Sequence, residues 1–199
     1  MSKVFGKHFV KKTEKANFRP FSGIRKRTFF INAKTKTVAR AGIIAALYVV
    51  LSLIVFPVAS GAIQFRLSEG LTLLALIFPE TPFALFVGCL LINVITGCAV
   101  YDVVFGSIIT LVAGFLTFFA GKLFKSDFMK IFIGGLFPVL LNAFLLPLIW
   151  YFCYGELEYA YILQVLLLLA GESASVYVAG TAFYLPVKKL REKNAGFLS

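Results

Sequence analysis

The chain has 199 residues, of which 60% are hydrophobic and only 15% are charged. Soluble globular domains carry roughly 45–50% apolar and about 25% charged residues, so this composition excludes an ordinary soluble domain and indicates an integral membrane protein. The length is sufficient for one compact helical bundle.

The net charge of +11 is concentrated at the start of the chain. Residues 1–36 contain eleven lysines and arginines and a single acid, Glu14. A basic segment beside membrane spans typically marks the cytoplasmic side and meets anionic lipid headgroups. A role in nucleic-acid binding is disfavoured because no binding module accompanies the segment. We predict a basic cytoplasmic extension over 1–36, a membrane domain over 37–190 and a cytoplasmic tail over 191–199.

Apolar runs predict six transmembrane helices. About 20 apolar residues are needed to cross the ~30 Å hydrocarbon core of a bilayer. The second run is short and ends at the sequence PETP, which is typical of a turn. The six runs cover 38–59, 62–78, 83–100, 103–123, 128–152 and 161–187. The predicted fold is therefore an all-α membrane bundle of six helices.

The charges between these runs predict the orientation of the bundle. If the N-terminus is cytoplasmic, the interior loops and the C-terminus receive the basic residues Lys122, Lys125, Lys130, Lys188, Lys189, Arg191 and Lys193. The exterior loops then receive the acids Asp102, Glu156 and Glu158. Because cytoplasmic loops carry the excess of lysine and arginine, we expect both termini in the cytoplasm.

Few polar residues lie in or beside the apolar runs, and all of them are expected in the same half of the bilayer. Ionisable groups inside spans are costly and generally face the bundle interior or a water-filled cavity. At about 1.5 Å per helical residue, all of them fall in the outer half of the bilayer. These residues are Arg66, Glu69, Asn93, Asp102, Asn142 and Glu172. They predict a substrate cavity open to the outside. In the alternative interpretation, each makes a private structural contact, such as an Arg66–Glu69 pair.

Small residues mark a face of the first helix. Ala41 and Ala45 are four residues apart, and Gly42 and Ala46 lie beside them. Such spacing permits close helix contact, which is consistent with internal packing or with a docking face for another membrane protein.

Several kinds of site are missing from the sequence. No nucleotide-binding P-loop occurs, so the chain does not itself couple ATP hydrolysis. The single histidine, His8, precedes the spans, and Ser173 and Ser175 have no partner base nearby. The cysteines Cys89, Cys98 and Cys153 match no metal motif and are interpreted as packing residues. We therefore predict a binding protein rather than an enzyme, with no cofactor or metal.

Five sequence blocks resemble one family of membrane proteins. The blocks FRLSEGLTLL, GCLLINVITG, YDVVFGSIITLVAG, LLNAFLLPL and GESASVYVAG occur in this order over residues 36–190. They resemble the QueT family, which comprises S components, the substrate-binding subunits of energy-coupling factor (ECF) transporters for queuosine precursors. Alanine is more frequent in the family after the glutamate of FRLSE, so Gly70 is a departure.

The resemblance implies a six-helix S component in the bacterial plasma membrane. Such a subunit captures its ligand, here a deazaguanine base, from outside and associates with a transmembrane coupling subunit and two ATPases. S components carry an Ala-x-x-x-Ala patch for the coupling subunit, and Ala41 and Ala45 match it. A carboxylate suits the paired N–H donors of a guanine-like edge, and asparagine amides suit its carbonyl and ring nitrogen.

Three other functions remain open from the sequence. The protein is alternatively an S component for another vitamin or nucleobase, which spacing alone does not distinguish. An intramembrane enzyme acting on lipid or prenyl substrates would need an acidic metal site or a nucleophile with a base. A purely structural membrane subunit would leave the layer of polar residues without a purpose.

Overall fold

The computed structural model describes the backbone of residues 22–59, 65–155, 157 and 159–193. The chain divides into two units, residues 1–35 and 36–199, and the second contains the predicted membrane domain. Most of the predicted basic extension, the exterior Glu156 and Glu158 and the end of the C-terminal tail lie outside the described residues.

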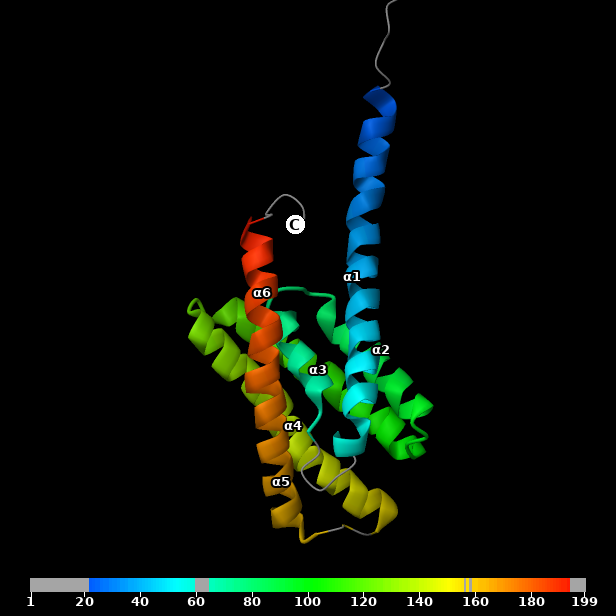
Figure 1. Cartoon of the computed structure of the whole chain (residues 1–199), viewed down its shortest axis with the longest axis vertical. Coiled ribbons are helices and arrows are strands. Elements are labelled where there is room, and N and C mark those ends of the chain that lie inside the picture. Colours follow the sequence, from blue (N-terminus) through cyan, green and yellow to red (C-terminus); the bar gives the residue numbers. More distant parts are fainter. Residues whose placement is uncertain (1–21, 60–64, 156, 158, 194–199) are drawn as a thin grey trace, which may run out of the picture. The chain divides into compact units, whose positions relative to one another are not determined.

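Every regular element among the described residues is helical, as predicted. The order is α1 (Ser22–Ala59), η1 (Leu67–Leu76), α2 (Thr81–Ile95), η2 (Asp102–Gly106), α3 (Ser107–Leu123), α4 (Asp127–Tyr154), α5 (Tyr161–Ser173), η3 (Ala174–Ala179) and α6 (Gly180–Lys193). The η1 element is a 3₁₀-helix, whereas η2 and η3 are π-helical segments. Because η2 leads directly into α3 and η3 joins α5 to α6, the elements form six helical rods (Figure 1).

Four of the six rods are long and apolar enough to cross a membrane alone. They cover Lys34–Pro57, Asp102–Leu123, Asp127–Tyr154 and Tyr161–Lys193. The other two, η1 and α2, are shorter. The prediction placed the end of the α2 rod at residue 100, but the helix ends at Ile95. Gly97 adopts a φ of 70°, a left-handed conformation that commonly terminates helices and is open to glycine.

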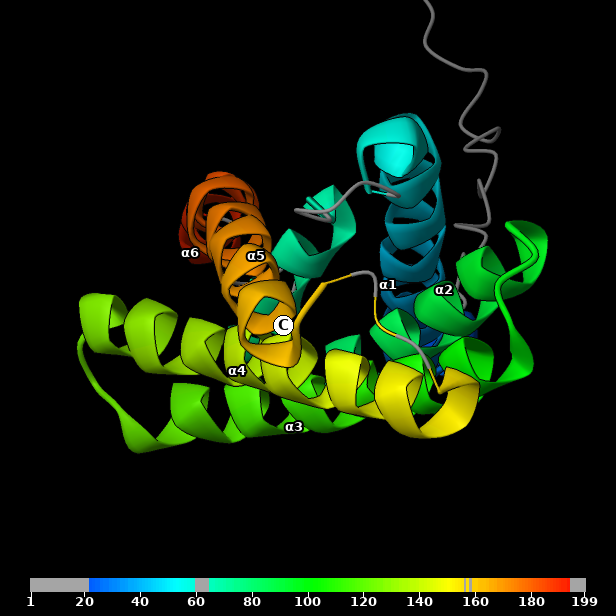
Figure 2. The ribbon, with the colours of Figure 1, turned by 90° about the horizontal axis from the view of Figure 1, so that it is seen from below.

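The short η1 helix lies at the centre of the second unit. Residues 68–75 are all buried, and η1 packs against α2, α3, α4, η3 and α6. A 3₁₀-helix rises about 2.0 Å per residue, compared with 1.5 Å for an α-helix, so ten residues of η1 reach about 20 Å. Around it, α3 and α4 lie side by side, and α2 packs on α3 (Figure 2).

Two glycines allow η1 to touch the last rod. A Cβ atom on Gly70 would lie 2.7 Å from the backbone nitrogen of Gly180, and one on Gly180 would lie 2.8 Å from the carbonyl oxygen of Gly70. Real Cβ atoms do not approach backbone so closely, so an alanine at either position requires the backbones to separate. The departure from alanine at Gly70 therefore has a packing reason.

The first helix crosses α2 at another glycine. A Cβ atom on Gly88 would lie 2.8 Å from the Cβ of Tyr48 and 3.1 Å from the carbonyl oxygen of Ala45. Ala45 is 8% exposed and belongs to the core, and Ala41 is half-buried against the same core. Ala45 thus serves internal packing, whereas Gly42 and Ala46 are exposed on the other side of α1.

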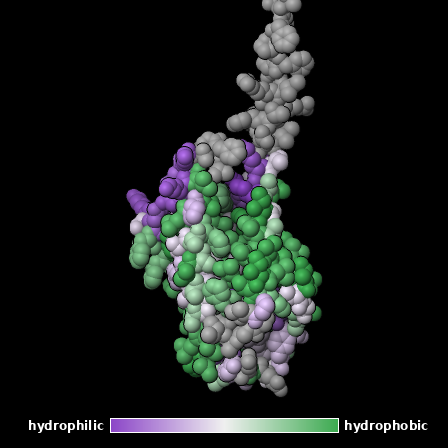
Figure 3. Space-filling model, viewed as in Figure 1, coloured by the Kyte–Doolittle hydropathy of each residue, from purple (hydrophilic) through white to green (hydrophobic). Residues whose placement is uncertain are grey.

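Polar contacts tie the rods together at one end, which we call the basic end. Arg40 pairs with Glu80 at 2.7 Å from Nε to Oε1, and its guanidinium lies over the ring of Phe78. Arg191 donates to the carbonyl of Ile77 at 3.0 Å, and Lys188 pairs with Asp127. Figure 3 shows hydrophilic residues gathered where α6 ends, above a band of apolar surface.

Candidate functional site

A cavity of about 230 Å³ lies at the opposite end of the rods from the basic end. It is enclosed by the later part of α1, the start of η1, the end of α2, η2 and the later part of α4. The side chains and backbone that line it belong to Tyr48, Ser52, Val55, Phe56, Arg66, Ser68, Cys89, Ile92, Asn93, Thr96, Cys98, Asp102, Gly106, Leu146 and Trp150. The lining combines one cation, several short hydrogen-bonding groups and three aromatic rings, which is the usual composition of a small-molecule site.

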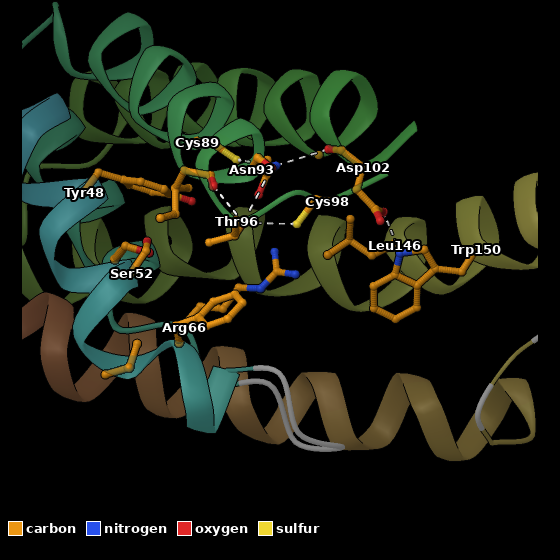
Figure 4. A pocket seen from close by; sticks show the side chains of 15 residues that line it. Tyr48, Ser52, Arg66, Cys89, Asn93, Thr96, Cys98, Asp102, Leu146 and Trp150 are labelled. Atoms are coloured by element: carbon orange, nitrogen blue, oxygen red, sulfur yellow. Dashed lines mark hydrogen bonds between the residues drawn. The ribbon is translucent and has the colours of Figure 1, made fainter. Parts of the chain in front are cut away.

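Arg66 directly precedes η1, and its side chain points into this cavity (Figure 4). Its guanidinium carries five N–H donors in a planar fork. Arg66 also interacts electrostatically with Glu172 and Glu69, which lie deeper in the bundle. The interaction of Arg66 therefore extends beyond Glu69, the partner in the alternative interpretation of these residues, to Glu172.

Asn93 and Asp102 meet where α2 faces η2. The Nδ2 of Asn93 donates to the backbone carbonyl of Asp102 at 3.2 Å. The carboxylate of Asp102 accepts two further bonds, from the indole N–H of Trp150 at 2.8 Å and from the hydroxyl of Tyr154 at 3.2 Å. Asp102 stands at the start of a π-helical segment, a distortion that often occurs at functional sites.

The other three predicted site residues form a buried group outside the cavity lining. Glu69 and Glu172 are fully buried, and Asn142 is 2% exposed. Tyr48 donates its hydroxyl to Oε1 of Glu69 at 2.5 Å. Asn142 is near both carboxyl groups. Within the part of the chain that the structure describes, Oε2 of Glu69 and both oxygens of Glu172 make no hydrogen bond.

Tyr48 connects these two regions, because it both lines the cavity and holds Glu69. Ser52, one turn later in α1, donates to Ser68 at 2.7 Å between the hydroxyl oxygens and so fixes α1 against the start of η1. The structure therefore brings Arg66, Asn93 and Asp102 to one cavity and places Glu69, Asn142 and Glu172 behind its wall.

Sequence reasoning missed several lining residues. Trp150 lies near the end of a predicted span, where tryptophan is typical of the membrane interface, so nothing in the sequence pointed to it as a lining residue. Cys89 is buried as expected of a packing residue, but it and the exposed Cys98 both line the cavity. A signal for Tyr48 was present, since a phenol inside a buried helix needs a hydrogen-bond partner.

The polar groups of the cavity lining are suited to binding a ligand. Among the described residues, no group of three or more His, Cys, Asp or Glu side chains is placed to hold a metal ion. The donors and acceptors near the cavity are a guanidinium, a carboxylate, hydroxyls, an amide, an indole N–H group and thiols, and most of them lie on helices or at helix ends. Such an arrangement suits recognition of a small polar molecule.

Comparison with known proteins assigns the chain to a family. No curated protein matches it, and no solved structure matches it. The family described as QueT transporter matches residues 38–189, which covers most of the chain and nearly all of the second unit. This multi-pass membrane protein therefore belongs to the QueT transporter family.

Proposed function

We propose that the protein is the substrate-binding S component of an ECF importer and that it captures a deazaguanine base, a queuosine precursor, from outside the cell. The observation that carries this proposal is the polar cavity of about 230 Å³ inside a membrane bundle of a transporter family. Drug-sized ligands occupy pockets of about 300–1,000 Å³, so a compact, base-sized ligand suits this one.

The lining supports a guanine-like ligand. A deazaguanine base presents a carbonyl, a ring nitrogen and adjacent N–H donors around a flat ring. Arg66 supplies donors for the carbonyl and ring nitrogen, and the amide oxygen of Asn93 accepts N–H groups. Behind the wall, Glu69 and Glu172 supply carboxyl oxygens that can accept from the N–H donors.

In this proposal the cavity faces outward and both termini are cytoplasmic, so η1 and α2 count as two of six membrane passes. The lysines and arginines of the basic end then lie at the cytoplasmic surface. The sequence carries no P-loop, so energy comes from a transmembrane coupling subunit and two ATPases.

We place the docking face for that coupling subunit on the exposed side of α1. Ala45, one of the two predicted docking residues, is turned toward α2, and Ala41 lies at the boundary of the core. Gly42 and Ala46 are exposed, and a Cβ atom on Gly42 would meet nothing within 4 Å. A helix of a partner subunit can approach closely over such small residues.

The test is a purification followed by an uptake assay. Chain purified from cells grown with queuosine precursors is analysed by mass spectrometry, and a deazaguanine base is expected at one equivalent per chain. Radiolabelled 7-cyano-7-deazaguanine is then supplied to cells that produce the chain with or without the coupling subunit and the ATPases. Uptake only in cells that produce the chain, the coupling subunit and the ATPases together supports the proposal. If a different vitamin or nucleobase is bound, the proposed ligand is wrong and the transport role stands. If uptake occurs without the ATPases, the proposed role as an S component is wrong.

A further inference from the structure

Trp150 occupies one wall of the cavity, and it is the single tryptophan of the chain. Residues with exposed aromatic rings continue beyond it on α4, including Tyr151 and Phe152. Trp150 differs from them because it is only half exposed and lines the cavity (Figure 4). Its place is therefore in the site rather than in an aromatic belt facing lipid.

Asp102 fixes the orientation of this indole. The N–H group, which is the one polar atom of the tryptophan side chain, donates to Oδ1 of Asp102 at 2.8 Å. The second oxygen of Asp102 accepts the hydroxyl of Tyr154, whose ring meets Tyr101 edge to face with centroids 5.9 Å apart. With its N–H group used, the indole offers the cavity carbon surface and π-electrons rather than a hydrogen bond.

The same cavity holds the polar groups that a flat heterocycle requires at its edges. Arg66 projects into the cavity, and Asn93 and Thr96 line it from the end of α2. A cation and amide at the edges and an aromatic ring at the wall are complementary to a planar ring with polar substituents. Stacking of a nucleobase on an aromatic side chain is favourable for every base, because each base has a π-face.

We propose that Trp150 is the stacking wall of the binding site for a flat heterocyclic ligand and that Asp102 is a positioning residue that holds the indole in place. The proposal rests on the proposed function in that the cavity is taken as the substrate site. It goes beyond that function by assigning Trp150 to ligand contact. It also gives Asp102 a role through Trp150 in place of the direct ligand contact that the sequence predicted.

The unmodified chain provides the first test. Because Trp150 is the single tryptophan, intrinsic fluorescence reports this wall alone. The purified full chain in detergent is titrated with three flat probes, 7-deazaguanine, guanine and pterin. Saturable quenching by 7-deazaguanine is the expected result. If pterin or guanine quenches the fluorescence and 7-deazaguanine does not, the proposed ligand is wrong but Trp150 is still the stacking wall. If calorimetry shows that a probe binds and no probe quenches the fluorescence, Trp150 is not the stacking wall and the proposed function stands. If no probe quenches and none binds, the stacking wall and the proposed function are both wrong.

Substitutions separate ligand contact from mere packing. Trp150→Leu is expected to weaken 7-deazaguanine binding at least tenfold by calorimetry, whereas Trp150→Phe keeps a ring and should remain within about threefold of the unmodified chain. The matched control is Tyr151→Leu, which removes an aromatic ring from the neighbouring residue outside this cavity and should leave the affinity unchanged. Unchanged affinity in Trp150→Leu would overturn the stacking wall.

The positioning role of Asp102 has its own signature. Asp102→Asn keeps an oxygen that accepts the indole N–H, so its emission spectrum and its quenching should match those of the unmodified chain. Asp102→Ala removes the acceptor, and its emission is expected to shift to longer wavelength while binding weakens. If Asp102→Asn loses affinity as strongly as Asp102→Ala with an unchanged emission spectrum, Asp102 contacts the ligand directly and the positioning role is wrong.

Discussion

The carboxylates of Glu69 and Glu172 lie in the same buried region as Asn142, with Arg66 the charged partner on the cavity side. Two buried acids of like charge are costly unless cations, hydrogen bonds or a ligand compensate for them. The hydroxyl of Tyr48 satisfies one oxygen of Glu69. A ligand that brings N–H donors toward this region gains hydrogen bonds to the carboxyl oxygens that Tyr48 does not bond.

We therefore expect Glu69→Gln and Glu172→Gln each to weaken binding of a deazaguanine base at least tenfold, which corresponds to about 1.4 kcal/mol. The amide is nearly isosteric, so the fold should persist while one acceptor oxygen is replaced by an NH2 group that cannot accept from the ligand. Isothermal titration of each purified variant measures the effect. The control is Glu80→Gln, which removes a buried carboxylate that pairs with Arg40 at the basic end and should leave affinity unchanged. Unchanged affinity in both Glu69 and Glu172 variants would make the buried group purely structural.

Cys98 offers a probe of access to the cavity. Its thiol is exposed and lines the cavity, whereas Cys89 is buried. In whole cells, a membrane-impermeant maleimide should label Cys98, and a saturating deazaguanine base should slow that labelling at least fivefold. The chain with Cys153→Ser removes the other accessible thiol, and the further change Cys98→Ser gives the background.

The same assay examines orientation. A cysteine introduced by Lys125→Cys, in the turn between α3 and α4, should react only after the membrane is permeabilised, provided that Cys98 and Cys153 are replaced by serine. Labelling of Lys125→Cys in intact cells together with protection of Cys98 until permeabilisation would reverse the proposed orientation.

At the residue scale, three of the six site residues predicted from the sequence line the cavity. Arg66, Asn93 and Asp102 stood out because a polar residue in an apolar run needs a polar surrounding. Counting residues along a helix gives depth but not direction around the axis, so the placement of Glu69 behind the wall, beyond Tyr48, was not predictable. The role of Trp150 depends on its bond to Asp102, a residue 48 positions away in the chain, which no local pattern contains.

Among the elements, η1 and α6 approach each other closely through their backbones at Gly70 and Gly180. We expect Gly70→Ala to destabilise the protein by about 1–3 kcal/mol, because the new methyl group would overpack against backbone rather than against a flexible side chain. Thermal unfolding in detergent measures this as a lower melting temperature.

Gly42→Ala is the matched control for that substitution. Gly42 also lies in a helix, but a Cβ atom there meets nothing within 4 Å, so the change should not lower the melting temperature. If the Gly70→Ala and Gly42→Ala variants have the same melting temperature, the backbones of η1 and α6 are far enough apart to accommodate a methyl group.

The helices themselves were largely predictable, because a long apolar run has few other stable forms in a membrane. All six runs contain a helix, and the predicted first and last residues of α4 are within two residues of the observed ones. The type of η1 was not predictable. Its 3₁₀ geometry accompanies burial on every side and backbone contact with Gly180, and both depend on the assembled fold.

For the whole molecule, the exposed side of α1 carries the proposed interaction with a coupling subunit. We expect Ala46→Trp to abolish uptake and co-purification with that subunit while leaving ligand affinity unchanged, since a bulky side chain separates helices that otherwise touch. The control Phe119→Trp places a tryptophan on an exposed position of α3 and should assemble normally. Normal assembly of Ala46→Trp would locate the docking face elsewhere.

The short rods η1 and α2 have a consequence for the lipid around the protein. Fifteen α-helical residues of α2 extend about 22 Å and η1 about 20 Å, compared with a hydrocarbon core of ~30 Å. Because both rods start or end at the turn Phe78–Glu80 of the basic end, their other ends, which frame the cavity, stop about 8–10 Å short of the far side of that core. The bilayer must thin locally, or headgroups and water must descend to the mouth of the cavity.

We therefore expect ligand association, measured by stopped-flow fluorescence of Trp150, to be faster in vesicles of short-chain phosphatidylcholine than in vesicles of long-chain phosphatidylcholine. Equal rates in both would mean that the mouth opens beside the membrane rather than within its thickness.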